Sequence, residues 1–293
     1  MSFVIPGGAK ESLSHSIEDY PDGIVLPIDK PYRWTSADVI RKVKFAAVKH
    51  FRKKNLKVGH AGTLDPLATG VLLVCIGPAC KRAQEFQDHD KEYVAGIRFG
   101  ATTPSYDLEK EVDRAFPHDQ VTEEAVRAVL PSFLGTQEQI APLFSAKSVD
   151  GVRAYEMARK LYRKAQTGTL DPDFDAAALE TLHHSTITIS GIELLDYVEA
   201  GAPADAPRTD APGSVSSTAS ARIHVADTSA LGLPEAHIRI ACSKGTYIRA
   251  FARDLGEALG TGAHLSSLVR TKTGTFRLED ALTLEEALAI LAE

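Results

Sequence analysis

Short apolar runs rich in β-branched residues alternate along the chain with segments whose apolar residues recur at helical spacing. The apolar runs predict strands at 23–31, 71–76 and 93–100, and alternation of polar and apolar residues predicts a half-buried strand at 237–243. Helical spacing or a helix-starting residue predicts helices at 37–52, 78–88, 123–134 and 247–259, with a short helix from 283 onward. Ser36 is the expected N-cap of the first helix. This alternation predicts one main sheet with flanking helices, in an α+β or mixed α/β fold.

The chain has 293 residues, which fits one large domain with appendages. We expect residues 1–22 to form a flexible arm and residues 23–293 to form the main domain. Residues 142–170 hold many charges and few apolar periodicities, which indicates an excursion from the core. Residues 200–221 are of low complexity and lack aromatic side chains, which is typical of a flexible insertion.

Composition excludes several classes of protein. No apolar run approaches the ~20 residues needed to span a bilayer, and the N-terminus lacks the pattern of a secretion signal. The three cysteines, Cys75, Cys80 and Cys242, include no Cys-x-x-Cys pair, which argues against a disulfide framework and against a zinc site. Cys75 and Cys242 lie in apolar runs, where buried thiols are expected. We therefore expect a cytoplasmic protein with no membrane partner and no metal. Separately from these observations, a monomer is expected.

The charge of the chain is unevenly distributed. A net charge of −6 speaks against a nucleic-acid partner when taken alone. Residues 41–57, however, hold eight bases and no acid, namely Arg41, Lys42, Lys44, Lys49, Arg52, Lys53, Lys54 and Lys57. Such a run is usually a solvated helix face. Phosphates nevertheless respond to local basic density, because fields are screened beyond roughly 8–10 Å in physiological salt.

The segment between this basic run and the strand at 71–76 is rich in glycine and proline and is expected to be a loop. It contains Asp65, which precedes Pro66, and a following proline bars the helical conformation and keeps the aspartate backbone extended. The flanking glycines permit tight turns and the close approach of a bulky ligand. Because Asp-Pro alone is a common turn, any function depends on the whole segment.

Residues 59–77 as a whole resemble the central motif of the TruB family of tRNA pseudouridine synthases. Four further blocks resemble the opening, tyrosine, thumb and arginine motifs of that family, in the family's order, at 23–36, 90–93, 144–156 and 242–264. Five ordered blocks are far more specific than any one motif. The resemblance implies an α+β pseudouridine synthase fold, with a mixed, mainly antiparallel sheet, flanking helices and an RNA-gripping thumb at about 142–170.

The resemblance also implies a catalytic domain that isomerises uridine 55 in the T-loop of tRNA to pseudouridine. That reaction breaks the bond from ribose C1′ to base N1 and rejoins the base through C5, so it needs a nucleophile but no redox cofactor, and none is expected. In this sequence the family's nucleophile corresponds to Asp65. Arg249 corresponds to its arginine partner, which would favour the charged carboxylate. Tyr93 would stack on the uracil and could remove a sugar proton.

The other implied site residues concern the bound base. The target uridine is paired inside a folded loop, so it has to be flipped out, at a cost of a few kcal/mol. His60 matches the family histidine that occupies the space left by the flipped base. Tyr247 and Leu268 would line the pocket that receives it. Each of these three side chains, considered alone, could equally be a structural residue.

The sequence departs from the family at two points, and two alternatives stay open. Only about 20 residues follow Lys272, so a C-terminal PUA-type domain is not expected, and Ser148 stands where many members have lysine. One alternative is a non-catalytic tRNA-binding protein. The other is a glycoside- or nucleoside-cleaving hydrolase, which needs a second carboxylate roughly 5–10 Å from the first. Asp107 and Asp254 are candidates for that second acid by elimination.

Overall fold

A computed structural model describes residues 3–5, 13–142, 148–149, 152–153, 184–201 and 222–292. The strands of its main sheet are β1 (Phe3–Val4), β2 (Ile24–Lys30), β3 (Val58–Ala61), β4 (Ala68–Ile76), β5 (Lys91–Phe99), β8 (Gly135–Ile140), β11 (His184–Val198), β12 (Glu235–Cys242), β13 (Ala263–Thr273) and β14 (Phe276–Arg277). Two small sheets pair β6 (Ala101–Thr102) with β7 (Arg114–Ala115) and β9 (Ser148–Val149) with β10 (Val152–Arg153).

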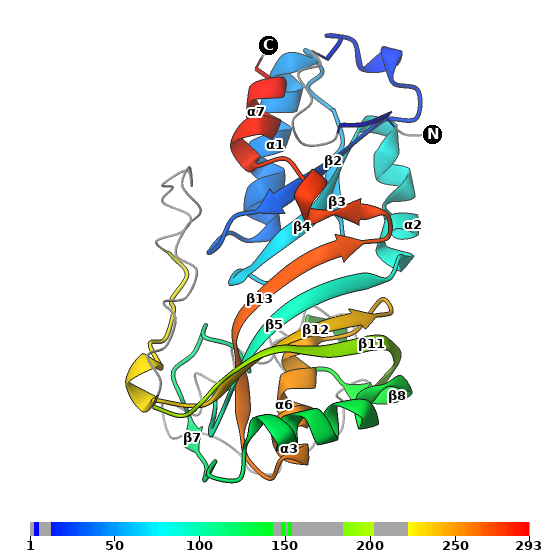
Figure 1. Cartoon of the computed structure of the whole chain (residues 1–293). Coiled ribbons are helices and arrows are strands. Elements are labelled where there is room, and N and C mark those ends of the chain that lie inside the picture. The colour runs from blue at the N-terminus through cyan, green and yellow to red at the C-terminus, as the bar shows by residue number, and fades with distance from the viewer. Residues whose placement is uncertain are drawn as a thin grey trace.

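The ten-stranded main sheet has the order β1-β2-β4-β13-β5-β12-β11-β8, with β3 beside β4 and β14 beside β13 (Figure 1). β1 runs parallel to β2, and β4 runs parallel to β13. All the other pairs in this sheet are antiparallel. The expected mixed, mainly antiparallel sheet is therefore confirmed. The parallel β4–β13 contact joins the two halves of the sheet, and the loop that carries Asp65 enters β4 at this junction.

The α-helices are α1 (Ser36–His50), α2 (Ala83–Asp88), α3 (Glu123–Val129), α6 (Ile248–Ala258) and α7 (Leu284–Ile290). Short 3-10 helices are η1 (Ile17–Asp19), η2 (Gly77–Arg82), η3 (Leu130–Phe133), η5 (Ser229–Leu231) and η6 (Leu278–Asp280). α1 and α7 lie together against the half of the sheet that contains β2, whereas α6 covers β13 and β5 in the other half (Figure 1). Apolar side chains from both halves form one continuous core.

The structure confirms the predicted strands and modifies three helix predictions. The segments predicted as helices at 78–88 and 123–134 each combine a 3-10 turn with a short α-helix. The prediction that Ser36 caps α1 is wrong. Thr35 is the N-cap, and its hydroxyl accepts a hydrogen bond from the backbone N–H of Asp38 at 3.0 Å. Ser36 is instead the first helical residue, and its side chain is buried.

The appendages are only partly described. Most of the expected thumb at 142–170 and of the expected insertion at 200–221 lies outside the described residues. The flexibility of residues 1–22 stays a prediction, and among the described residues of that arm Ile5, Leu13 and Ile17 are buried against the core. No helix within the described ranges is long and apolar enough to cross a membrane. Cys75 and Cys242 are buried, as predicted.

Candidate active site

Asp65 lies on a loop that is shorter than the sequence suggests. Residues 58–61 and 68–76 are strands, which leaves only residues 62–67 as the connection. The Ser36 hydroxyl accepts a hydrogen bond from the Leu64 N–H at 2.9 Å and lies 3.1 Å from the Leu64 carbonyl oxygen, to which it donates. Ser36, which was predicted to cap α1, thus connects the first turn of α1 to the loop. This arrangement fixes the backbone next to Asp65.

Lys30, the last residue of β2, also holds the backbone of this loop. Its side chain is fully buried, and its ammonium donates to the carbonyl oxygens of Pro66 at 3.1 Å, Pro31 at 2.9 Å and Trp34 at 2.5 Å. Burial lowers the pKa of Lys30 to about 7, although the neighbouring Asp65 opposes this shift. Lys30 was not predicted as a site residue, although it lies in the block at 23–36 that resembles the opening motif of the family.

Asp65 and Arg249 form a two-pronged ion pair across the sheet junction. Nε of Arg249 lies 2.9 Å from Oδ2 of Asp65, and Nη2 lies 3.2 Å from Oδ1. The arginine is the second residue of α6 and is only 5% exposed, whereas the side chain of Asp65 is 37% exposed. A bidentate guanidinium fixes the plane of a carboxylate as well as compensating its charge. The carboxylate is therefore oriented and still open to a ligand.

A second carboxylate, Asp107, contacts the same guanidinium. Its Oδ2 lies 3.8 Å from Nε of Arg249, and its Oδ1 accepts hydrogen bonds from the hydroxyl of Ser105 at 2.6 Å and the N–H of Glu109 at 3.0 Å. Burial raises the pKa of Asp107, and Arg249 opposes that rise. For Arg249, burial disfavours the charge, but the carboxylates of Asp65 and Asp107 raise its pKa overall.

The position of Asp107 bears on the hydrolase alternative. Asp107 is nearly buried, and its oxygens contact Arg249, Ser105 and a backbone N–H. Asp254, the other candidate acid, is bonded to Arg253, with 2.7 Å between Nε and Oδ1. Each of the two aspartates is thus paired with an arginine, which favours its ionised form over the protonated form that a general acid needs. Sequence reasoning named Asp107 only by elimination, and the structure assigns it to the Asp65–Arg249 network.

A cleft of about 530 Å³ opens beside this ion pair. It brings together five of the six predicted site residues, namely Asp65, Tyr93, Tyr247, Arg249 and Leu268. Tyr93 is 8% exposed, and burial raises the pKa of its hydroxyl, with Arg270 opposing the rise. A phenol with a raised pKa stays protonated at neutral pH. The cleft thus offers one oriented carboxylate, two aromatic rings and an apolar wall.

His60, the sixth predicted residue, does not line this cleft. It lies on β3 opposite Val74 of β4, partly buried, and burial lowers the pKa of its imidazole. Its Nδ1 is a buried atom with no hydrogen-bond partner among the described residues. The expected role of His60, in the space left by a flipped base, stays a prediction.

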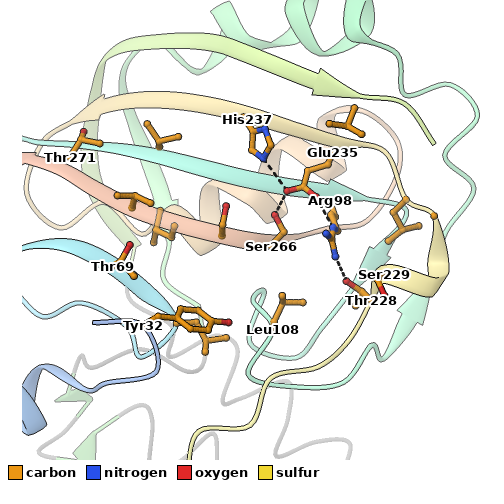
Figure 2. A pocket seen from close by; sticks show the side chains of 18 of the residues that line it. Tyr32, Thr69, Arg98, Leu108, Thr228, Ser229, Glu235, His237, Ser266 and Thr271 are labelled. Atoms are coloured by element: carbon orange, nitrogen blue, oxygen red, sulfur yellow. Dashed lines mark hydrogen bonds and ion pairs between the residues drawn. The ribbon is translucent and has the colours of Figure 1, made fainter. Parts of the chain in front are cut away.

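Asp65, Asp107 and Arg249 also line a small separate pocket. A second cavity, of about 460 Å³, adjoins this small pocket and shares Leu67, Leu108 and Leu268 with it. Figure 2 shows the polar network on its wall, in which the Glu235 carboxylate accepts from Arg98, His237 and Ser266. The Arg98–Glu235 contact is 2.7 Å long, and Arg98 also donates to Thr228 at 2.8 Å. Burial alone would raise the pKa of Glu235, but the hydrogen bonds and the Arg98 charge lower it to about 2.

This network predicts a pH-dependent contribution to stability. Because the pKa of Glu235 falls from 4.5 to about 2 on folding, its contribution is complete above pH 4.5 and is lost as the pH falls toward 2. A shift of this size corresponds to about 3 kcal/mol. We expect Glu235→Gln to lower the free energy of unfolding by about that amount at pH 7 and by about half as much at pH 3. Urea unfolding at both pH values measures the difference.

Glu193→Gln is the matched control for this measurement. Glu193 also pairs with an arginine, Arg239, but its side chain is 60% exposed. Its substitution is expected to change the free energy of unfolding by less than about 1 kcal/mol at either pH. Equal losses at pH 7 and pH 3 in Glu235→Gln would contradict the proposed linkage.

The sequence of this chain was compared with family models and with known proteins. Residues 49–169 match the family model of the TruB pseudouridylate synthase N-terminal domain, and residues 249–293 match that of the tRNA pseudouridylate synthase B C-terminal domain. The chain is 44% identical over 267 residues to tRNA pseudouridine synthase B of Phocaeicola vulgatus, covering 91% of this chain and 92% of that protein. It is 45% identical to the protein of the same name from Bacteroides thetaiotaomicron, with the same coverage.

Solved structures show the same fold at lower identity. A Cbf5-Nop10-Gar1 complex matches with a TM-score of 0.57 and 23% identity over 97% of this chain. An H/ACA RNP bound to a substrate RNA containing 2′-deoxyuridine matches with a TM-score of 0.53 and 22% identity. The chain spans 62% and 61% of the length of the matched chains in these two structures. The mixed sheet with flanking helices is the pseudouridine synthase fold. Within that class, the chain belongs to the TruB family.

Proposed function

We propose that this protein converts uridine 55 in the T-loop of tRNA into pseudouridine, with Asp65 as the nucleophile. As a member of the TruB family, the chain is a tRNA pseudouridine synthase, an isomerase that acts on uridine. The observation that carries the proposal is the bidentate Asp65–Arg249 pair beside an open cleft of about 530 Å³. The position in tRNA follows from the resemblance of the five sequence motifs to those of the family.

The geometry suits the chemistry that the isomerisation requires. The bond from C1′ to N1 has to break and a bond from C1′ to C5 has to form, with release of the C5 proton. Attack on C1′ or on C6 of the uracil requires an ionised and oriented carboxylate, which the Arg249 fork supplies for Asp65. Asp107, held by Ser105 and by the N–H of Glu109, contacts the arginine from its other side.

The walls of the cleft suit a flipped base. Extrusion of a paired uridine costs a few kcal/mol, which stacking and phosphate contacts offset. Tyr93 and Tyr247 are the two aromatic side chains that line the cleft, and Leu268 adds an apolar contact. We assign stacking on the uracil to Tyr93, and we assign His60 to the space that the base leaves in the RNA. Residues 142–170 are proposed to grip the RNA as a thumb of the catalytic domain at 23–293.

The choice of uridine is tested with tRNA that carries tritium at C5 of every uracil. Isomerisation releases the label of the modified position into water. We expect one equivalent of tritium from a wild-type tRNA transcript and none from a transcript in which uridine 55 is replaced by cytidine. Release that persists in the cytidine transcript would contradict the assignment of position 55 while leaving the isomerase activity in place.

The basic cluster at 41–57 is proposed to hold the tRNA backbone. All eight of its basic side chains are exposed, although the whole chain has a net charge of −6. We expect the triple substitution of Lys53, Lys54 and Lys57 by glutamine to flatten the salt dependence of tRNA binding. The slope of log K against log salt concentration should become shallower by about 0.9 for each phosphate that the protein no longer neutralises. Filter binding across a salt series measures this slope.

Arg127 and Arg239 provide the matched control. Both are exposed and form surface ion pairs, with Glu123 and Glu193, away from the cluster. Their substitution by glutamine removes positive charge from the chain without touching residues 41–57. An equal change of slope per charge in the two variants would mean that tRNA responds to net charge alone, and the proposed surface would be wrong.

A further inference from the structure

Arg270 is a buried cation that grips the backbone on both sides of Asp65. It lies on β13 and is 2% exposed. Its Nε donates to the carbonyl oxygen of Val71 at 2.8 Å, Nη2 to that of Gly62 at 3.1 Å, and Nη1 to that of Thr63 at 3.4 Å. Two of these carbonyls stand at the start of the Asp65 loop, and the third follows its end. One guanidinium therefore bridges the two stems of the loop.

This burial is not explained by an acidic partner. None of the ion pairs within the described residues includes Arg270. An isolated charge is costly to bury, and hydrogen bonds to its protons are needed to offset that cost. The three carbonyl oxygens supply such bonds. An apolar side chain at this position would avoid the cost but could not tie the loop stems together.

A glycine in β4 allows the strand that carries Arg270 to lie close to the loop. Arg270 stands opposite Gly70 in the parallel register of β13 and β4. Gly70 has a φ of +101°, and a Cβ added there would lie 2.2 Å from the Arg270 carbonyl oxygen. Any other residue at position 70 would therefore push the two strands apart. Because β13 lies this close to β4, the Arg270 guanidinium is within hydrogen-bonding distance of the loop carbonyl oxygens.

Two further loop contacts come from the half of the sheet that contains β2. Lys30 of β2 bonds the Pro66 carbonyl, and Ser36 of α1 bonds Leu64. Arg270 of β13 bonds Gly62 and Thr63. The loop is consequently held from both halves of the sheet. Ser36 and Lys30 hold the two neighbours of Asp65, and Arg270 holds the two residues that precede Leu64. Loss of the β13 anchor would free Gly62 and Thr63 and leave the contacts of Ser36 with Leu64 and of Lys30 with Pro66 in place.

We propose that Arg270 is a positioning residue for the isomerisation, which sets the direction of the Asp65 carboxylate through the loop backbone without acting on the reacting atoms. This inference rests on the proposed role of Asp65 as nucleophile. A misplacement of a reacting group by about 1 Å can lower a rate by about 10²-fold. The expected signature is a fall in kcat with little change in tRNA affinity, because Arg270 lines the cleft but is only 2% exposed and lies outside the basic cluster at 41–57.

The test compares Arg270→Lys and Arg270→Ala with the wild type in single-turnover tritium release and in tRNA binding. Lysine keeps the charge but lacks the planar fork, so both variants should lose about 10²-fold in rate while the Kd for tRNA stays within about twofold. Millimolar guanidinium chloride should restore part of the rate in the alanine variant, because it can refill the vacated space. Hydrogen exchange at the amides of residues 62–65 and 67 should accelerate in both variants.

Arg98→Lys is the matched control for loss of a buried arginine from the same sheet, since Arg98 is 6% exposed and pairs with Glu235 instead of the loop. Its exchange rates at 62–67 and its kcat should match those of the wild type. A folded Arg270 variant with wild-type kcat would overturn the proposal, as would weakened tRNA binding with unchanged kcat. Failure of both Arg270 variants to fold, with Arg98→Lys folded, would assign Arg270 to folding and also overturn it.

Asp65→Asn is assayed alongside to separate this inference from the proposed function. An inactive wild type, or an active Asp65→Asn, would refute the proposed function whatever the Arg270 variants do. An active wild type and an inactive Asp65→Asn, together with fully active Arg270 variants, would refute the positioning role alone.

Discussion

Asp65→Asn is expected to abolish isomerisation, with a loss in kcat on the order of 10⁴-fold or more, as is typical when a covalent nucleophile is removed. The amide has nearly the same shape as the carboxylate but carries no charge with which to attack carbon. It can still accept a hydrogen bond from Arg249, so the fold and the cleft should persist. Tritium release from labelled T-loop RNA measures the loss.

A binding measurement and a second substitution serve as controls for this variant. The Kd of Asp65→Asn for tRNA should stay close to that of the wild type, because the RNA grip is proposed to lie in residues 41–57 and 142–170. Asp196→Asn, a change of the same kind at a side chain that is 66% exposed, should leave the rate unchanged. Tritium release by Asp65→Asn at even a hundredth of the wild-type rate would be inconsistent with a nucleophilic role.

Arg249→Met is expected to lower kcat by roughly 10²- to 10³-fold, which is the usual effect of removing one preorganised charged donor from an active site. The guanidinium holds Asp65 with two contacts and also faces Asp107, so its loss leaves two carboxylates without their shared cation. Arg249→Lys should recover only part of the rate, since an ammonium cannot reproduce the planar fork. Single-turnover tritium release gives both values.

Arg253→Lys is the control for Arg249, since it lies one turn later on the same helix and pairs with Asp254. Its rate should equal that of the wild type. If Arg249→Met and the wild type isomerise at similar rates, the ion pair is structural and the account of the site fails at its centre. If Arg249→Met loses tRNA binding instead of rate, the arginine contacts the RNA.

The sheet was predictable only where its strands carry an apolar signal. The runs at 23–31 and 71–76 are buried on both faces, and they match β2 and β4 closely. β13 escaped prediction although it lies in the middle of the sheet. Its buried polar residues, such as His264 and Arg270, have partners that only the folded chain supplies, as in the 2.9 Å contact between His264 Nδ1 and the Ala101 carbonyl. No periodicity in the sequence announces such a strand.

The residues of the site likewise fall into those that the sequence could predict and those that it could not. Asp65 and Arg249 are 184 residues apart, and only the ordered motifs of a resembled family could predict that they meet. Their supports, Lys30 and Arg270, went unrecognised, because both are buried cations that bond to backbone carbonyls. Carbonyl groups are present at every residue and leave no trace in the sequence. Family motifs can thus name both members of a side-chain pair, whereas a bond from a side chain to a backbone carbonyl has only one member that a motif can name.

The most direct test of the whole account is the fate of uracil in T-arm RNA incubated with the protein. Digestion to nucleosides, followed by chromatography and mass spectrometry, separates uridine, pseudouridine and free uracil. The account predicts one equivalent of pseudouridine per RNA, with unchanged mass and an uncut chain. Free uracil would indicate a hydrolase that uses Asp65, and unaltered uridine in a stable complex would indicate a tRNA-binding protein without this activity. Either result would contradict the assignment of Asp65 as the nucleophile of a pseudouridine synthase.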